Sequence, residues 1–127
     1  MTTHDWKITQ VISITDGDTV RLHLVRTSDL DNEFDMDIRT KRERRGIAIR
    51  LIILDTPEKG QVGYLDAKAN LGKWLDLRAT HLRVETYASA GWDRLLGDIY
   101  VEGSRGDTAT QYMLQAGWNV YTGPKGA

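Results

Sequence analysis

Cysteine is absent from the sequence, histidine is scarce, and no long apolar run occurs. Without cysteine the chain has no disulfides, no thiolate zinc site and no cysteine nucleophile. The three histidines are scattered, which argues against a histidine metal site or a catalytic triad. No window approaches the roughly eighteen apolar residues of a membrane span, and the start, MTTHDWKITQ, lacks the apolar core of a signal peptide. We therefore expect a cytoplasmic protein that does not associate with membranes, with secretion by another route still open.

The net charge is also close to zero, because 17 basic and 18 acidic residues give a formal charge of −1. Such a chain has no overall basic field that attracts nucleic acid from a distance, so polyanion binding has to come from local clusters. The length of 127 residues supports one domain with one core. We expect a single-domain monomer.

The pattern of apolar residues predicts a chain of short strands with two helices. Alternation and β-branched residues predict strands at 7–15, 19–26, 47–54, 80–87 and 95–102. Helical spacing predicts helices at 64–79 and 107–116, the second capped by Asp107 and stopped at Gly117. The acidic and then basic segment at 27–46 is predicted to form a hairpin insertion. This order indicates an α+β fold, and the five-stranded Greek-key barrel of the oligonucleotide-binding (OB) fold, with two helices, accommodates it.

The stretch TDGDTV, between the first two predicted strands, allows two interpretations. Asp-Gly is a common hairpin signal, so the simpler interpretation is a plain turn. The other gives Asp18 a place in a metal site together with acids further along the chain. The acids at 29–37 do not form a helix-loop-helix calcium loop, because the glycine and the closing glutamate are missing at the required offsets.

Charged residues also gather around the end of the apolar run IAIRLIIL. Arg50 interrupts this run, where it either pairs with a nearby carboxylate at the edge of the sheet or serves a site. Asp55 and Glu58 then bracket a Thr-Pro turn. A permanent cation and two carboxylates are therefore expected near one rim of the sheet.

If the fold brings Asp18 beside Asp55, the two carboxylates repel each other unless a cation lies between them. With no cysteine and no suitable histidine pattern, oxygen ligands favour calcium or magnesium. A loose shell of two carboxylates, a backbone carbonyl such as that of Thr56, and water suits Ca²⁺ better than Mg²⁺. Glu58 then remains to orient or deprotonate a water molecule.

Three motifs together are similar to those of the staphylococcal nuclease (thermonuclease) family. They are DGDTV at 16–20, RLIILDTPE at 50–58 and WDRLLGDIY at 92–100, and the first two are specific as a pair. The resemblance implies an OB barrel and calcium-dependent hydrolysis of phosphodiester bonds in DNA and RNA with little sequence preference. The roles it implies are Asp18, Asp55 and the Thr56 carbonyl as calcium ligands, Glu58 as the carboxylate that acts on the attacking water, and Arg50 and Arg94 as the phosphate-binding cations.

Two aromatic residues and one departure from the family complete the set of candidates. Trp92 and Tyr121 are candidates for stacking on a base, with packing in the core or at an edge as the alternative. Asp93 stands where the family usually has glycine and can partly neutralise Arg94. The alternative function is a noncatalytic nucleic-acid-binding module, or an accessory module that docks on another protein through the acidic strand at 29–37.

Overall fold

The computed structural model describes residues 4–26, 46–78, 81–89 and 94–120. Within these ranges the fold is α+β, as predicted, with a mostly antiparallel six-stranded sheet, two helices and a separate pair of short strands. The sheet comprises β1 (His4–Asp16), β2 (Thr19–Arg26), β3 (Ile47–Leu51), β5 (Leu82–Ser89), β6 (Arg94–Val101) and β7 (Ser104–Thr108). The short pair is β4 (Leu54–Asp55) with β8 (Asn119–Val120), and the helices are α2 (Tyr64–Leu77) and α3 (Ala109–Gln115).

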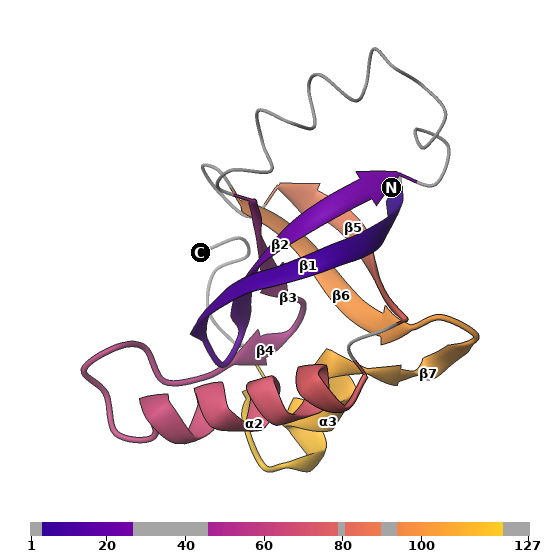
Figure 1. The fold of residues 1–127 in the computed structure, drawn as a ribbon. Helices are drawn as coiled ribbons and strands as arrows, with labels where there is room; N and C mark the ends of the chain where they lie inside the picture. Colours follow the sequence, from indigo (N-terminus) through magenta and orange to yellow (C-terminus); the bar gives the residue numbers. More distant parts are fainter. Residues whose placement is uncertain (1–3, 27–45, 79–80, 90–93, 121–127) are drawn as a thin grey trace.

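The sheet closes on itself. Its strand order is β3-β2-β1-β5-β6-β7, and β3 also pairs with β6 in parallel, so five strands form a ring from which β7 extends. Figure 1 shows α2 and α3 lying together below this ring, next to β4. The predicted insertion at 27–46 lies outside the described residues except for Gly46.

The core lies inside the ring and against α2. Val20 and Leu22 of β2 and Ile49 of β3 are fully buried, and so is Trp74 of α2. Successive side chains of a strand point to opposite faces, so the burial of Ile49 inside the ring places its neighbour Arg50 on the outer face. The core therefore fixes the direction in which this arginine points.

The predicted strand at 47–54 is wrong at its C-terminal end. β3 stops at Leu51, and a turn at Ile52 and Ile53 separates it from β4. The backbone of Ile53 has a φ of 53°, a left-handed conformation that β-branched residues rarely adopt. The turn directs residues 54–56 to one end of the ring, where the loop between β1 and β2 also lies (Figure 1).

The predicted cap of the second helix is also wrong. Thr108 is the N-cap of α3, and its hydroxyl accepts a hydrogen bond from the backbone N–H of Gln111 at 3.1 Å. Asp107 instead accepts hydrogen bonds from Nε1 of Trp74 on α2 at 3.1 Å and from Nε of Arg78, the C-cap of α2, at 2.8 Å. These bonds join the end of β7 to α2. Neither described helix is long and apolar enough to cross a membrane.

Candidate functional site

Asp18 is the centre of the candidate site. It lies in the turn between β1 and β2 and is only 3% exposed. Its Oδ1 forms an ion pair with Nη1 of Arg50 at 3.0 Å and accepts a hydrogen bond from the hydroxyl of Thr19 at 3.0 Å. Its Oδ2 accepts a hydrogen bond from the backbone N–H of Thr56 at 3.0 Å, and its backbone carbonyl accepts one from the N–H of Leu51 at 2.7 Å. The turn is therefore more than a connection, because its carboxylate ties together β3 and the segment after β4.

Asp55 and Thr56 lie next to this carboxylate. The Cα of Asp55 is about 2.4 Å from the Thr56 nitrogen by covalent geometry, which places it at most about 5.5 Å from Oδ2 of Asp18. Asp55 is exposed, whereas Thr56 is buried and its Oγ1 has no hydrogen-bond partner among the described residues. The structure thus brings two predicted calcium-binding residues, Asp18 and Thr56, into direct contact and places Asp55 beside them.

Arg50 is held on the outer face by more than its ion pair. Its Nη2 donates a hydrogen bond to the carbonyl of Leu54 at 3.4 Å, across the turn at Ile52 and Ile53. Its side chain is 12% exposed. Of the two interpretations of Arg50, the structure shows the pairing with a carboxylate, and this carboxylate is one of the predicted metal ligands. The role of Arg50 in binding phosphate stays a prediction.

Arg94 begins β6 on the same face of the sheet as Arg50. The parallel register places Arg94 opposite Ala48 and Leu96 opposite Arg50, and residues two apart share a face. A rise of about 3.3 Å per residue and a strand spacing of about 4.8 Å put the Cα atoms of the two arginines about 8 Å apart. Arg94 is half-buried, and the register places it on the same face of the sheet as Arg50.

Glu58 is not among the described residues that contact Asp18. Glu58 is exposed, in a turn where its N–H donates to Oε1 of Gln61 at 2.8 Å and its carbonyl accepts from the N–H of Gln61 at 2.9 Å. Among the described residues, no three acidic or histidine side chains are close enough together to hold a metal ion. The predicted meeting of Glu58 with Asp18 and Asp55 stays a prediction. Trp92, Asp93 and Tyr121 lie outside the described residues.

Asp16 is a member of the site that sequence reasoning missed. Its Oδ1 accepts a hydrogen bond from the backbone N–H of Asp18 at 3.1 Å. Burial raises the pKa of Asp16 to about 7; the side-chain hydrogen bond and the charge of Asp18 act in the same direction, whereas the hydrogen bond from the Asp18 N–H lowers it. The signal was available in the sequence, because Asp16 and Asp18 flank the glycine of the turn.

The pKa of Asp18 moves the other way. Burial favours a higher value, but hydrogen bonds with Asp16 and the Thr56 N–H, together with the positive charge of Arg50, outweigh it and hold the pKa below its usual 3.8. Below about pH 7 the proton that the pair retains therefore resides on Asp16, and Asp18 is ionised.

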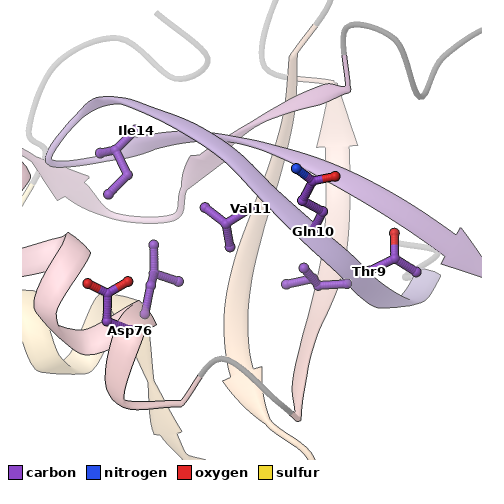
Figure 2. A pocket seen from close by; sticks show the side chains of 7 residues that line it. Thr9, Gln10, Val11, Ile14 and Asp76 are labelled. Carbon is purple, nitrogen blue, oxygen red and sulfur yellow. The ribbon is translucent and has the colours of Figure 1, made fainter.

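Two hollows of the surface lie away from Asp18. One is a pocket of about 310 Å³ between β1 and α2, which is lined by Ile8, Thr9, Gln10, Val11, Ile14, Leu75 and Asp76. Figure 2 shows it from close by. Its side chains are mainly apolar, with one carboxylate at the edge, and none belongs to the predicted site. Another hollow, of about 470 Å³, follows Glu58 along the chain and is lined by residues between Gly60 and Asp66.

No family model and no curated protein matches the chain. The function is therefore inferred from the contacts around Asp18 and from the motifs that these contacts join.

Proposed function

We propose that this chain is a calcium-dependent nuclease that hydrolyses phosphodiester bonds of DNA and RNA with little sequence specificity. The observation that carries the proposal is the contact between the DGDT turn and the RLIILDTPE segment. Asp18 of the first motif binds Arg50 and the Thr56 N–H of the second, although 32 and 38 positions separate them in sequence. Two motifs that resemble one family as a pair are thus adjacent in space.

The proposal includes the finer description of the fold. A ring of five strands with a helix beneath it agrees with the OB barrel that the resemblance to the staphylococcal nuclease family implies. The outer face of such a barrel binds oligonucleotides in many proteins. Arg50 and Arg94 lie on that face of β3 and β6.

The oxygen atoms of Asp18 and its neighbours are of the kind that binds a hard cation. A carboxylate has about four positions that accept a hydrogen bond or a metal. In Asp18 the contacts with Arg50, Thr19 and Thr56 use three of them, and the hydrogen bond with the Asp16 side chain competes with a cation for the fourth. Asp55 is exposed beside it, and the buried Thr56 hydroxyl, without a partner in the described part of the chain, adds an oxygen in the same corner. Asp18, Asp55 and the Thr56 carbonyl would hold Ca²⁺, which supplies Lewis acidity and orients the phosphate when bound.

The two arginines account for the stabilisation of charge. Attack on a phosphodiester builds negative charge on the nonbridging oxygens, and fixed cations directed at these oxygens stabilise the transition state more than the ground state. A guanidinium suits this role because its planar fork donates two parallel hydrogen bonds to phosphate. Arg50 is already oriented by Asp18 and the Leu54 carbonyl, so little reorganisation is needed.

Glu58 is the proposed base. It lies two residues after Thr56 and is exposed, so a water molecule can reach its carboxylate. Its role in the proposal is to orient and deprotonate the water that attacks the phosphorus.

A noncatalytic nucleic-acid-binding module is the second candidate. One observation favours it: the described residues contain no group of three acids that could hold a metal, while Arg50 is neutralised by Asp18. Such a module would still bind phosphate through Arg94, without cleavage.

One assay separates the two candidates. Purified protein is incubated with single-stranded DNA or with RNA, in Ca²⁺ or in excess chelator, and cleavage is followed on a gel. We expect cleavage in Ca²⁺ only. Glu58→Ala should lower the cleavage rate at least about a hundredfold, since one group that stabilises the transition state is worth about 2.7–4 kcal/mol. Glu102→Ala, at another exposed glutamate, is the matched control and should cleave normally.

Undiminished cleavage in chelator would overturn the metal assignment. Binding of both substrates without cleavage under any divalent ion would establish the binding module instead. Both variants change exposed side chains, so a loss of folding does not confuse the result.

A further inference from the structure

The short strand β8 places a carboxamide directly opposite Asp55. In the β4–β8 ladder, Asp55 pairs with Asn119, and Leu54 pairs with Val120. Residues directly opposite in an antiparallel pair have side chains on the same face, with Cβ atoms about 4.5–5.5 Å apart. Leu54 is buried and Asp55 is exposed, so Asn119, which is also exposed, shares the outer face with Asp55.

We propose that Asn119 is a further ligand of the divalent cation, through its Oδ1, at the proposed calcium site. The inference rests on the proposed function, because it adds a residue to the same site. Aspartate and asparagine have side chains of equal length, so their terminal oxygens reach equally far from the ladder. Two Ca–O bonds of about 2.4 Å span at most about 4.8 Å, which matches the separation of the two side chains.

The number of ligands also argues for an additional oxygen. Ca²⁺ takes six to eight oxygen ligands, and amide oxygens of asparagine are among those it accepts. Asp18, Asp55 and the Thr56 carbonyl supply three ligand positions, and each carboxylate that binds through both oxygens adds another. An oxygen from Asn119 on the exposed side of Asp55 would complete the shell on the side away from Asp18.

The position of Asn119 is fixed by its neighbour Trp118. The indole Nε1 of Trp118 donates a hydrogen bond to Oδ1 of Asn70 on α2 at 2.9 Å, and its backbone N–H donates to the carbonyl of Met113 on α3 at 3.1 Å. Its ring also packs beside Gly63, 3.6 Å from where a side chain would begin. Asn119 thus lies between an anchored tryptophan and a backbone ladder, so little entropy is lost when its amide binds an ion.

Calorimetric titration of Ca²⁺ into the protein tests this inference. We expect Asn119→Ala to raise the Kd for Ca²⁺ about tenfold and Asn119→Asp to lower it, because ligand number and ligand charge tune calcium affinity. The Ca²⁺-induced rise in unfolding temperature should change in the same order. Gln115→Ala removes an exposed carboxamide at the end of α3 and should leave the Kd unchanged.

The outcomes distinguish this inference from the function on which it rests. If Asp55→Asn weakens Ca²⁺ binding while Asn119→Ala and Asn119→Asp both bind like the unaltered protein, Asn119 is not a ligand and the calcium site stands. If the unaltered protein binds no Ca²⁺, both the inference and the metal assignment fall. A loss of binding in Asn119→Ala that Asn119→Asp does not restore would show a structural role of the amide and would also overturn the inference.

Discussion

Replacing Arg50 by methionine should destabilise the fold as well as remove a phosphate-binding group. The substitution keeps an unbranched apolar stem but leaves the Asp18 carboxylate, whose side chain is 4% exposed, without its ion-pair partner. Removal of one partner from a buried pair costs about 3–5 kcal/mol, because the remaining charge stays buried. That is a large part of the stability of a domain, which is typically about 5–15 kcal/mol.

Urea unfolding followed by tryptophan fluorescence measures this effect. Trp74 is fully buried in the core and reports the global transition. At an m-value of about 1.5–2 kcal/mol/M, a loss of about 3 kcal/mol moves the midpoint down by roughly 1.5–2 M. An arginine that served catalysis alone would leave the midpoint where it is.

The pH dependence of the stability loss in Arg50→Met identifies its cause. The pKa of Asp18 is below its ordinary 3.8, so in the unaltered protein this carboxylate contributes stability above about pH 4 and loses it as pH falls through the folded pKa. Without Arg50 the pKa of Asp18 rises, and protonation then removes the uncompensated charge. The loss of unfolding free energy in Arg50→Met should therefore be full at pH 7 and become smaller toward pH 4.

A double-mutant cycle with Asp18→Asn completes the test. Asn at this position carries no charge, so Arg50→Met should cost at least about 2 kcal/mol less in that background. Two results would refute the reasoning: a midpoint for Arg50→Met within about 0.2 M of the unaltered protein, or costs that add within about 0.5 kcal/mol.

Three further substitutions test local features of the site. Asp16→Asn should stabilise the chelator-treated protein by more than about 1 kcal/mol at pH 8 and have little effect at pH 4, because a carboxyl with a raised pKa costs stability as pH rises toward about 7. Equal effects at both pH values in urea unfolding would contradict this. Ile53→Asn should raise stability by about 1 kcal/mol, since asparagine tolerates a φ of 53°, whereas Leu77→Asn at another exposed position, in a helix, should not; a lower melting temperature for Ile53→Asn would count against backbone strain. Gly17→Ala should cost about 1–3 kcal/mol by calorimetry, because its Cβ would lie 2.5 Å from a methyl of α2, whereas Gly106→Ala meets nothing within 4 Å and should be neutral; similar melting temperatures for the two would show that the turn has room to move.

The sequence was most informative where a pattern is long. Strands with alternating burial and the 14-residue helix α2 were predicted close to their observed positions, because many residues repeat the same signal. The break after Leu51 was not predictable, since IIL is a favourable strand sequence. The chain leaves the sheet just after Ile52, whose N–H still binds the carbonyl of Gly97, because the backbone of Ile53 turns into a left-handed conformation with a φ of 53°.

Short elements and choices between similar residues depend on distant partners. β4 and β8 have two residues each, too few for any periodicity. Asp107 and Thr108 are both good helix caps, and the positions of Trp74 and Arg78, 33 and 29 residues away in sequence, decide that the aspartate binds α2 and its C-terminal end. The partner of Arg50 was unpredictable for the same reason, because several carboxylates were available and the fold selects Asp18.

Cleavage of single-stranded DNA by the unaltered protein and by Asp55→Asn, over a range of Ca²⁺ concentrations, tests the central claim most directly. Asp55 is exposed, so its substitution should leave folding intact, which the urea midpoint checks. The account predicts cleavage that saturates with Ca²⁺ in the unaltered protein and a rate at least about a hundredfold lower in Asp55→Asn. Equal rates for the two proteins, or a rate that does not depend on Ca²⁺, would contradict it.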